Sequence, residues 1–183
     1  MTKMNQSGQA FSVFKLLIAA IVAVFILALL LQILSNITPP SQGDPTDEAG
    51  SKIKTLLTKL GTPERTAVVT FQPGQILSAR TIANKTGALD GEDVCVMVGE
   101  SDSDNSNFET GDGTTVVYSG NSNVQRRLYI LCDLKNEISN TVSSLSSVPL
   151  VEEAFVNGAP DCSSPPDQTS DRYCIVSIIP TGT

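Results

Sequence analysis

The chain contains no histidine and no tryptophan, and only 5% of its 183 residues are aromatic. Histidine is the usual proton-transfer group at neutral pH, and both the Ser-His-Asp and the Cys-His catalytic arrangements require it. Those arrangements are therefore excluded, which leaves carboxylate or lysine chemistry. No pair of carboxylates can be nominated for it, so the sequence favours a protein that is not an enzyme.

Acidic residues are absent from the N-terminal region and outnumber basic ones in the rest of the chain. Residues 1–35 contain Lys3 and Lys15 and no acidic residue, whereas the remainder contains ten basic and nineteen acidic residues. This remainder, with a net charge of −9, is repelled by the phosphates of nucleic acids and by anionic lipid surfaces. We therefore expect no nucleic-acid partner.

Cysteine is absent from the first 94 residues, and the four that follow, Cys95, Cys132, Cys162 and Cys174, form no C-x-x-C pair. A zinc or redox motif thus has little support, and no cofactor is expected. An even number of cysteines on the exported side of a membrane anchor indicates two disulfides. Of three connectivities, we favour Cys95–Cys132 with Cys162–Cys174. The alternative is a cytosolic domain with buried free thiols.

The longest apolar run, Leu16 to Leu31, contains no glycine, proline or charged residue. With its flanks it extends over Phe11–Leu34, and 24 residues form a helix of about 36 Å, enough to cross a hydrocarbon core of about 30 Å. Lysines precede the run and acidic residues follow it, so the positive-inside rule places the N-terminus in the cytoplasm. We therefore expect a long transmembrane helix within 9–37.

A short polar leader with a glycine precedes this run, in SGQAFSVFKLLIAAIVAVFILALLL. A secretory signal has a shorter apolar region and a small-x-small cleavage site, which LLLQILSNITPP does not offer. The layout is that of a class III signal peptide, and the stretch resembles the start of an archaeal type IV pilin-like protein. The resemblance implies that residues 1–8 are a leader, removed by cleavage between Gly8 and Gln9.

The same resemblance implies a structural subunit of a surface filament, assembled through the apolar helix. Its partners would be identical or related pilin subunits, a prepilin peptidase and a membrane assembly platform. The precursor would lie in the cell membrane, and the mature chain in a filament at the cell surface or outside the cell. Close helix approach would use small residues, namely Ala19, Ala20, Ala23 and Ala28.

Two departures from the bacterial pattern stand in the same stretch. The fifth mature residue would be Val13, where bacterial relatives have a glutamate that neutralises a neighbour's amino terminus. Lys15, at the seventh, carries the opposite charge. The competing interpretation is an uncleaved single-pass anchor that carries an extracellular binding domain. A carboxylate-based surface hydrolase is a third.

The remaining chain is predicted to be a linker over 38–50 and an extracellular β-rich domain over 51–183. The linker is rich in proline and glycine, and a short amphipathic helix, SKIKTLLTKLG, follows it with Ser51 as its cap. A second helix is predicted in DLKNEISNTVSSLSS, capped by Asp133. Six segments rich in β-branched residues read as strands: RTAVVTF, QILSARTIA, EDVCVMVGE, TTVVYSG, RRLYILCDL and RYCIVSIIP.

The expected fold class is therefore α+β, with a long hydrophobic N-terminal helix and a mainly antiparallel sheet or sandwich that includes one or two short helices. Short turns between the strands, with no regular helix in most connections, favour antiparallel pairing. Such a domain would form the outside of a filament and mediate subunit contacts or adhesion. It would equally suit an anchored binding protein, so the fold does not separate those two interpretations.

Two weaker site hypotheses concern surface chemistry. Asp102, Asp104 and Glu109 in the acidic loop could offer oxygen ligands to Ca²⁺, although the spacing is not that of an EF-hand and a solvated hairpin loop is the favoured interpretation. Asn36 and Asn84 each begin an N-glycosylation sequon, of which Asn84 is the better placed. Two such triplets in a chain of this length are near chance.

Overall fold

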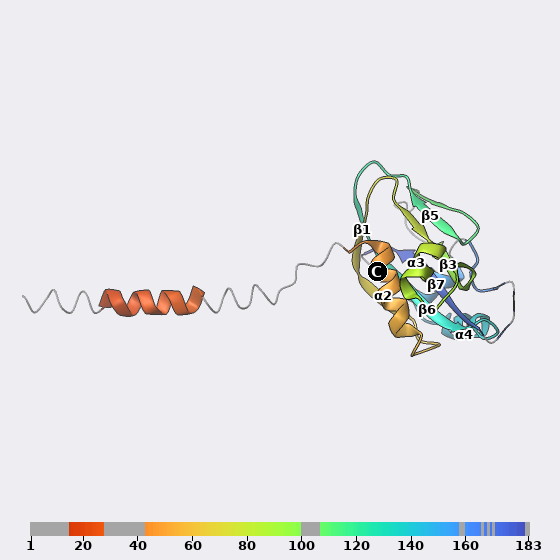
Figure 1. Ribbon diagram of the computed structural model, residues 1–183, viewed down its shortest axis with the longest axis horizontal. Coiled ribbons are helices and arrows are strands. Elements are labelled where there is room, and N and C mark those ends of the chain that lie inside the picture. Colours follow the sequence, from red (N-terminus) through yellow and green to blue (C-terminus); the bar gives the residue numbers. More distant parts are fainter. Residues whose placement is uncertain are drawn as a thin grey trace, which may run out of the picture. The chain divides into compact units, whose positions relative to one another are not determined.

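The computed structural model describes residues 15–27, 43–99, 107–157, 160–165, 167, 169 and 171–181 (Figure 1). The chain divides into two compact units between Pro39 and Pro40. The described part of the first unit is one helix, and that of the second is a folded domain. Each unit is described by itself below.

The N-terminal helix covers residues 15–27, which is about half of the predicted 24 residues. Among the described residues, no helix combines the length and the hydropathy that crossing a membrane requires. The prediction of a long N-terminal transmembrane helix is therefore wrong for the described structure. The apolar run of the sequence extends beyond this helix to residues outside the described ranges.

The domain is built on a four-stranded mixed sheet in the order β1-β6-β7-β3. Strand β6 pairs antiparallel with both β1 and β7, while β3 pairs parallel with β7 and places Val96 opposite Val176. The expectation of a mainly antiparallel domain holds for two of these three pairings only. The strands are β1 (Glu64–Phe71), β3 (Val94–Val98), β6 (Val124–Leu134) and β7 (Arg172–Ile179).

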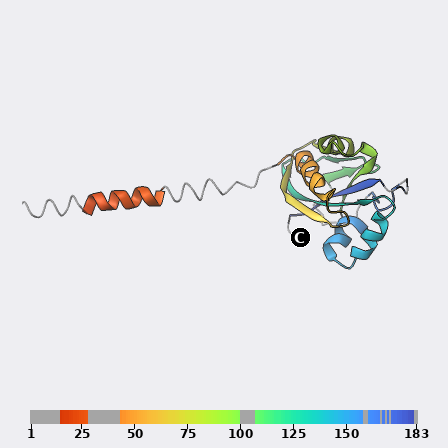
Figure 2. The same cartoon turned by 60° about the horizontal axis from the view of Figure 1, so that its bottom comes forward.

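Helices cover both faces of this sheet (Figure 2). On one face lie α2 (Pro45–Leu56) and α3 (Ala79–Thr86); on the other lie α4 (Ile138–Leu145), the short α5 (Pro149–Val151) and the π-helical turn η3 (Glu152–Val156). Side chains alternate between the two layers, as β3 shows: Val94, Val96 and Val98 face α2 and α3, whereas Cys95 and Met97 face α4 and η3. The predicted sandwich is therefore wrong, because helices rather than a second sheet bury both faces.

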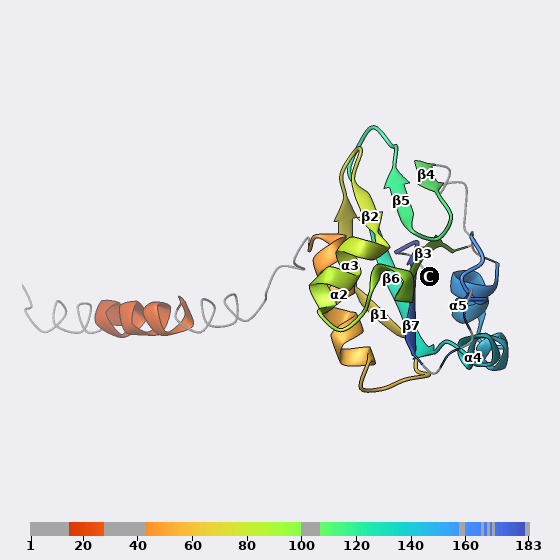
Figure 3. The same cartoon turned by 45° about the vertical axis from the view of Figure 1, so that its right-hand side comes forward.

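A smaller antiparallel sheet, in the order β2-β5-β4, lies at one end of the domain (Figure 3). Its strands are β2 (Ile76–Ser78), β4 (Phe108–Thr110) and β5 (Thr115–Tyr118). An aromatic cluster joins it to the main sheet: the Phe71 ring of β1 lies 5.2 Å from Phe108 in an edge-to-face arrangement, and Phe108 lies 4.9 Å from Tyr118. A 3₁₀ turn, η1 (Gly91–Asp93), leads into β3.

Helix α2 begins at Pro45, inside the segment predicted to be a linker, and not after Ser51. Proline fits the first turn because its missing N–H would have no partner there. The Asp44 carboxylate accepts a hydrogen bond from the Thr46 N–H at 2.8 Å and caps the helix, and Asp47 and Glu48 suit the positive end of its dipole. The helix buries Ala49, Ile53 and Leu56 completely.

Gly50 explains how α2 and α3 can lie so close together. A Cβ atom at this position would come within 2.7 Å of the Lys85 Cβ of α3. The ammonium of the same Lys85 forms an ion pair with Asp47 at 2.6 Å. Glycine in a helix costs about 1 kcal/mol relative to alanine, and here it permits the contact between the two helices.

The other local predictions are corrected in part. The segment QILSARTIA was predicted to be one strand, but only Ile76–Ser78 is extended, and α3 follows at once. The helix predicted in DLKNEISNTVSSLSS is confirmed as α4, yet Asp133 is not its cap. The Asp133 carboxylate instead accepts hydrogen bonds from the Thr141 hydroxyl and from the Leu134 N–H.

The start of α2 can be tested with three substitutions at two positions. Asp44→Ala removes the cap and should lower the free energy of unfolding by about 1 kcal/mol, whereas Asp44→Asn should retain most of it. Ser51→Ala, at an exposed position inside the helix, should change it by less than about 0.5 kcal/mol. Urea unfolding followed by circular dichroism measures all three variants. A larger loss for Ser51→Ala would contradict the observed start.

Candidate functional site

The N-terminal helix exposes apolar surface on all sides. Every residue from 15 to 27 is exposed, with Leu16 at 70% and Phe25 at 66%. Ala19, Ala20 and Ala23 lie within it, with Ala19 and Ala23 on the same face at i and i+4. A helix that is hydrophobic on every side normally lies inside lipid or a larger assembly, so this surface is the first candidate for an interaction.

Several predicted site residues lie outside the described residues. These are the two residues of the cleavage site, one helix-packing alanine, one sequon and two of the calcium candidates: Gly8, Gln9, Ala28, Asn36, Asp102 and Asp104. Of the described ones, Glu109 is exposed on β4 and Asn84 is exposed on α3. Within the described ranges, no three histidine, cysteine or acidic residues are grouped so that they could hold a metal ion.

All four cysteines form disulfides, but in a different connectivity from the favoured one: Cys95–Cys162 and Cys132–Cys174. Cys132 and Cys174 lie directly opposite each other on β6 and β7. Cys95 could not reach Cys132, because β7 separates their strands and the two side chains face opposite layers. Each bridge thus joins cysteines on one face of the sheet.

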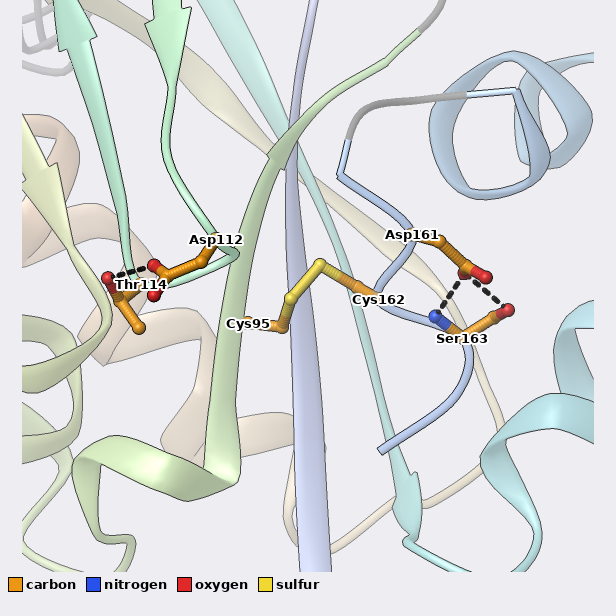
Figure 4. Close-up of a disulfide and its surroundings, with 6 residues drawn as sticks. All are labelled: Cys95, Asp112, Thr114, Asp161, Cys162 and Ser163. Atoms are coloured by element: carbon orange, nitrogen blue, oxygen red, sulfur yellow. Dashed lines mark hydrogen bonds between the residues drawn. A yellow bond between two sulfur atoms is a disulfide. The ribbon is translucent and has the colours of Figure 1, made fainter. Parts of the chain in front are cut away.

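The Cys95–Cys162 bridge fastens β3 to the loop that precedes β7, and the tip of the β4–β5 hairpin packs on it (Figure 4). Gly113 at this tip has φ +86°, and a Cβ there would lie 2.6 Å from the Cys95 sulfur. Its carbonyl accepts a hydrogen bond from the Val96 N–H at 2.7 Å. The hairpin can therefore pack against β3 only with a glycine at this position.

Acidic side chains flank the bridge on both sides. The Thr114 hydroxyl donates a hydrogen bond to the Asp112 carboxylate at 2.7 Å and lowers the pKa of that carboxyl. On the other side, the Asp161 carboxylate accepts from the Ser163 N–H and hydroxyl at 2.9 and 2.7 Å. Figure 4 shows the two carboxylates on either side of the disulfide, each held by its own turn.

Two adjoining polar hollows share Asp90 and Glu92. The first, of about 570 Å³, contains an ion pair between the Lys135 ammonium and the Asp93 carboxylate at 2.8 Å, with side chains only 10% and 18% exposed. The hydrogen bond to Asp93 raises the pKa of Lys135. The pair fastens η1 to the residue that follows β6.

The second hollow, of about 820 Å³, is lined by Arg80, Asn84 and Thr114 among others. Asn84 therefore lies at its rim with an exposed amide. Its sequon partner Thr86 is buried, and its hydroxyl donates to the Ala83 carbonyl at 2.7 Å. Once the domain has folded, the sequon is thus part of a helix and its hydroxyl is occupied.

The residues that sequence reasoning missed are Asp93, Lys135 and Gly113. Asp93 and Lys135 each stand next to a buried strand, before β3 and after β6, and a charged residue at the end of a buried run is the only signal they carry. Their meeting depends on how the strands are ordered in the sheet. Comparison of the chain with protein-family models, with curated proteins and with solved structures finds no match.

The packing of the hairpin on the disulfide can be measured with a matched pair of glycines. Gly74 has φ +76°, and a Cβ atom added there would have no neighbour within 4 Å, whereas one added at Gly113 would meet the Cys95 sulfur. Gly74→Ala should cost about 1 kcal/mol for backbone strain alone. Gly113→Ala should cost about 2 kcal/mol or more. Equal losses of unfolding free energy for the two variants would show that the hairpin can move away from the disulfide at no further cost.

Stability should fall above a pH of about 10. Burial, followed by Asp161 and Asp93, raises the pKa of Tyr173 from 10.0 to about 12. The stability is therefore fully present below a pH of about 10 and is lost as the pH rises through about 12, by at most about 3 kcal/mol. Lys135, whose pKa is also raised, acts in the same direction.

Urea midpoints measured between pH 9 and pH 11.5 would test this dependence. Tyr173→Phe removes the ionising phenol, so its stability should fall less steeply than that of the parent protein over the same range. Parallel curves for the two proteins would assign the alkaline loss to other groups.

Proposed function

We propose that this chain is a non-enzymatic structural subunit of an archaeal type IV pilus-like surface filament, assembled through its apolar N-terminal segment after cleavage behind Gly8. One observation carries the proposal. In the sequence, a helix that is apolar on every side, residues 15–27, follows a polar leader that ends in a glycine and precedes a domain that buries its own core.

The physical argument starts from the exposed apolar surface. Before assembly, lipid would surround it; after assembly, copies of the same segment would replace the lipid, so that the surface never meets water. Small side chains at Ala19 and Ala23, one helical turn apart, would let neighbouring backbones approach closely. Removal of the polar leader on the cytoplasmic side would free the segment to leave the lipid and join the filament.

The domain supports the outer position in such a filament. Two apolar clusters lie on the two faces of its sheet, so it needs no partner to complete its core. Both disulfides are compatible with an oxidising environment outside the cell. Its acidic surface would then be the part of the filament that contacts other subunits or external targets.

A specific observation also favours the alternative, an uncleaved membrane-anchored binding domain. The two adjoining hollows around Asp90 and Glu92 would offer a polar binding surface to a ligand. Both interpretations place the domain outside the cell and the N-terminus in the membrane. They differ in whether the leader is removed and whether the chains polymerise.

The N-terminus of the chain recovered from native membranes and from sheared surface material decides between them. Intact mass and peptide sequencing should find a chain that begins at Gln9 and sediments as filaments. Gly8→Val should block cleavage and leave the full precursor in the membrane, whereas Ser7→Ala, next to it, should be processed normally. A wild-type chain that keeps Thr2 to Gly8 would end the filament proposal and leave the anchored binding domain.

A further inference from the structure

The two apolar clusters of the domain draw their residues from different parts of the sequence. The cluster under α2 and α3 combines residues from both halves of the domain, such as Ile53, Val69 and Leu128. The cluster under α4 and η3 comes entirely from Cys95 onward. Its buried members are Cys95, Met97, Tyr129, Leu131, Ile138, Val142, Val151, Ala154, Phe155, Cys162, Tyr173, Ile175 and Ile179.

The disulfides begin at the same residue. Cys95–Cys162 and Cys132–Cys174 overlap along the chain, so every residue between Cys95 and Cys174 lies inside at least one cross-linked loop. Residues 43–94, which contain α2, β1, β2, α3 and η1, lie outside both loops. One cluster and both covalent bridges therefore belong to the part after residue 94, which can keep a core of its own.

The segment 43–94 is held to the rest by contacts that can open. Two of its ion pairs, Lys52–Glu64 at 2.8 Å and Lys85–Asp47, are internal to it. Its links to the remainder include the shared cluster, the ladders of β1 with β6 and of β2 with β5, the Asp93–Lys135 ion pair and single hydrogen bonds such as that from the Gly61 N–H to the Cys132 carbonyl. Asp93 of the ion pair lies only two residues before Cys95, at the boundary between this segment and the disulfide-bonded part.

We propose that residues 43–94 form a releasable segment, which extends under load while the disulfide-bonded part, residues 95–181, stays folded. About 50 residues of at most ~3.6 Å each would lengthen the chain by about 180 Å. Load would enter at Gly43, because the apolar segment that holds the chain lies on that side. The inference rests on the proposed function only in one respect, namely that the load is applied from the N-terminal side.

The topology sets the order in which the segment opens. Gly43 pairs with Val69 of β1 through a single parallel bridge, so a pull on Gly43 breaks that bridge and then detaches α2 from its N-terminal end. Edge strand β1 follows. The pull acts on its Glu64 end, opposite Ile130, whereas the C-terminal handle acts at the other end of the sheet, where Ile179 of β7 lies opposite Arg127, so the ladder of β1 with β6 is loaded in shear. Loss of this ladder therefore sets the force of the release. The release ends at Cys95, where the covalent bridge carries the load to Cys162.

Single-molecule stretching of the purified full chain in detergent, with handles at its two ends, tests the proposal. The oxidised chain should lengthen by about 180 Å in a first transition and by about 70 Å in a second, at higher force, as the ~20 residues after Cys162 are released. Residues 96–161 stay inside the bridged loop. A reductant should release them as a further ~240 Å.

Two matched variants assign the transitions to the two parts. Ile53→Ala, in α2, and Ile138→Ala, in α4, each truncate a fully buried isoleucine, the first in the shared cluster and the second in the later one. Ile53→Ala should lower the force of the first transition alone, and Ile138→Ala that of the second alone. A single transition of about 250 Å in the oxidised chain would overturn the proposal, as would equal effects of both variants on one transition. Because the measurement uses isolated chains, its failure would leave leader cleavage and filament assembly unaffected.

Discussion

The domain depends on one constraint: strands β6 and β7 are buried on both faces and need a helical layer on each. Leu128, Ile130 and Cys132 pack under α2 and α3, while Tyr129 and Leu131 of the same strand pack under α4 and η3. Loss of either layer exposes one apolar face of these strands to water and lowers their stability, so the part after residue 94 depends on its other layer and on the two disulfides when α2 and α3 are released. The order of the helices along the chain, two before the central strands and the rest between β6 and β7, follows from this requirement.

The disulfides reinforce the same arrangement. Each joins cysteines on one face of the sheet, so the sheet itself separates the two bridges. Cys132–Cys174 ties the two central strands to each other, and Cys95–Cys162 fastens β3 to the loop before β7. In a domain of this size such bridges stabilise mainly by restricting the unfolded chain. Their placement after residue 94 leaves α2, β1 and α3 to noncovalent contacts alone.

Surface properties divide along the chain as well. Among the described residues, most of the exposed large apolar side chains belong to residues 15–27, whereas acidic carboxylates of the domain line its two hollows and flank the hairpin tip. A chain with this division suits a protein whose one end is held in an apolar environment and whose other end is in water. The buried Asp93–Lys135 pair shows that part of the domain's charge serves to fasten its own elements.

The sequence by itself determined the apolar N-terminal run, the exclusion of histidine-based catalysis, most strand segments and α4, because each depends on residue types and on spacing within a short window. A strand in EDVCVMVGE places Val94 and Cys95 on opposite faces, but the sequence does not say what covers each face. Only the tertiary structure decided the parallel pairing of β3 with β7, the start of α2 at Pro45 and the partners of the four cysteines. These depend on which strands become neighbours, because residues as distant as Cys95 and Cys162, 67 positions apart, are brought together by the arrangement of the sheet and its connecting loops and not by any local pattern.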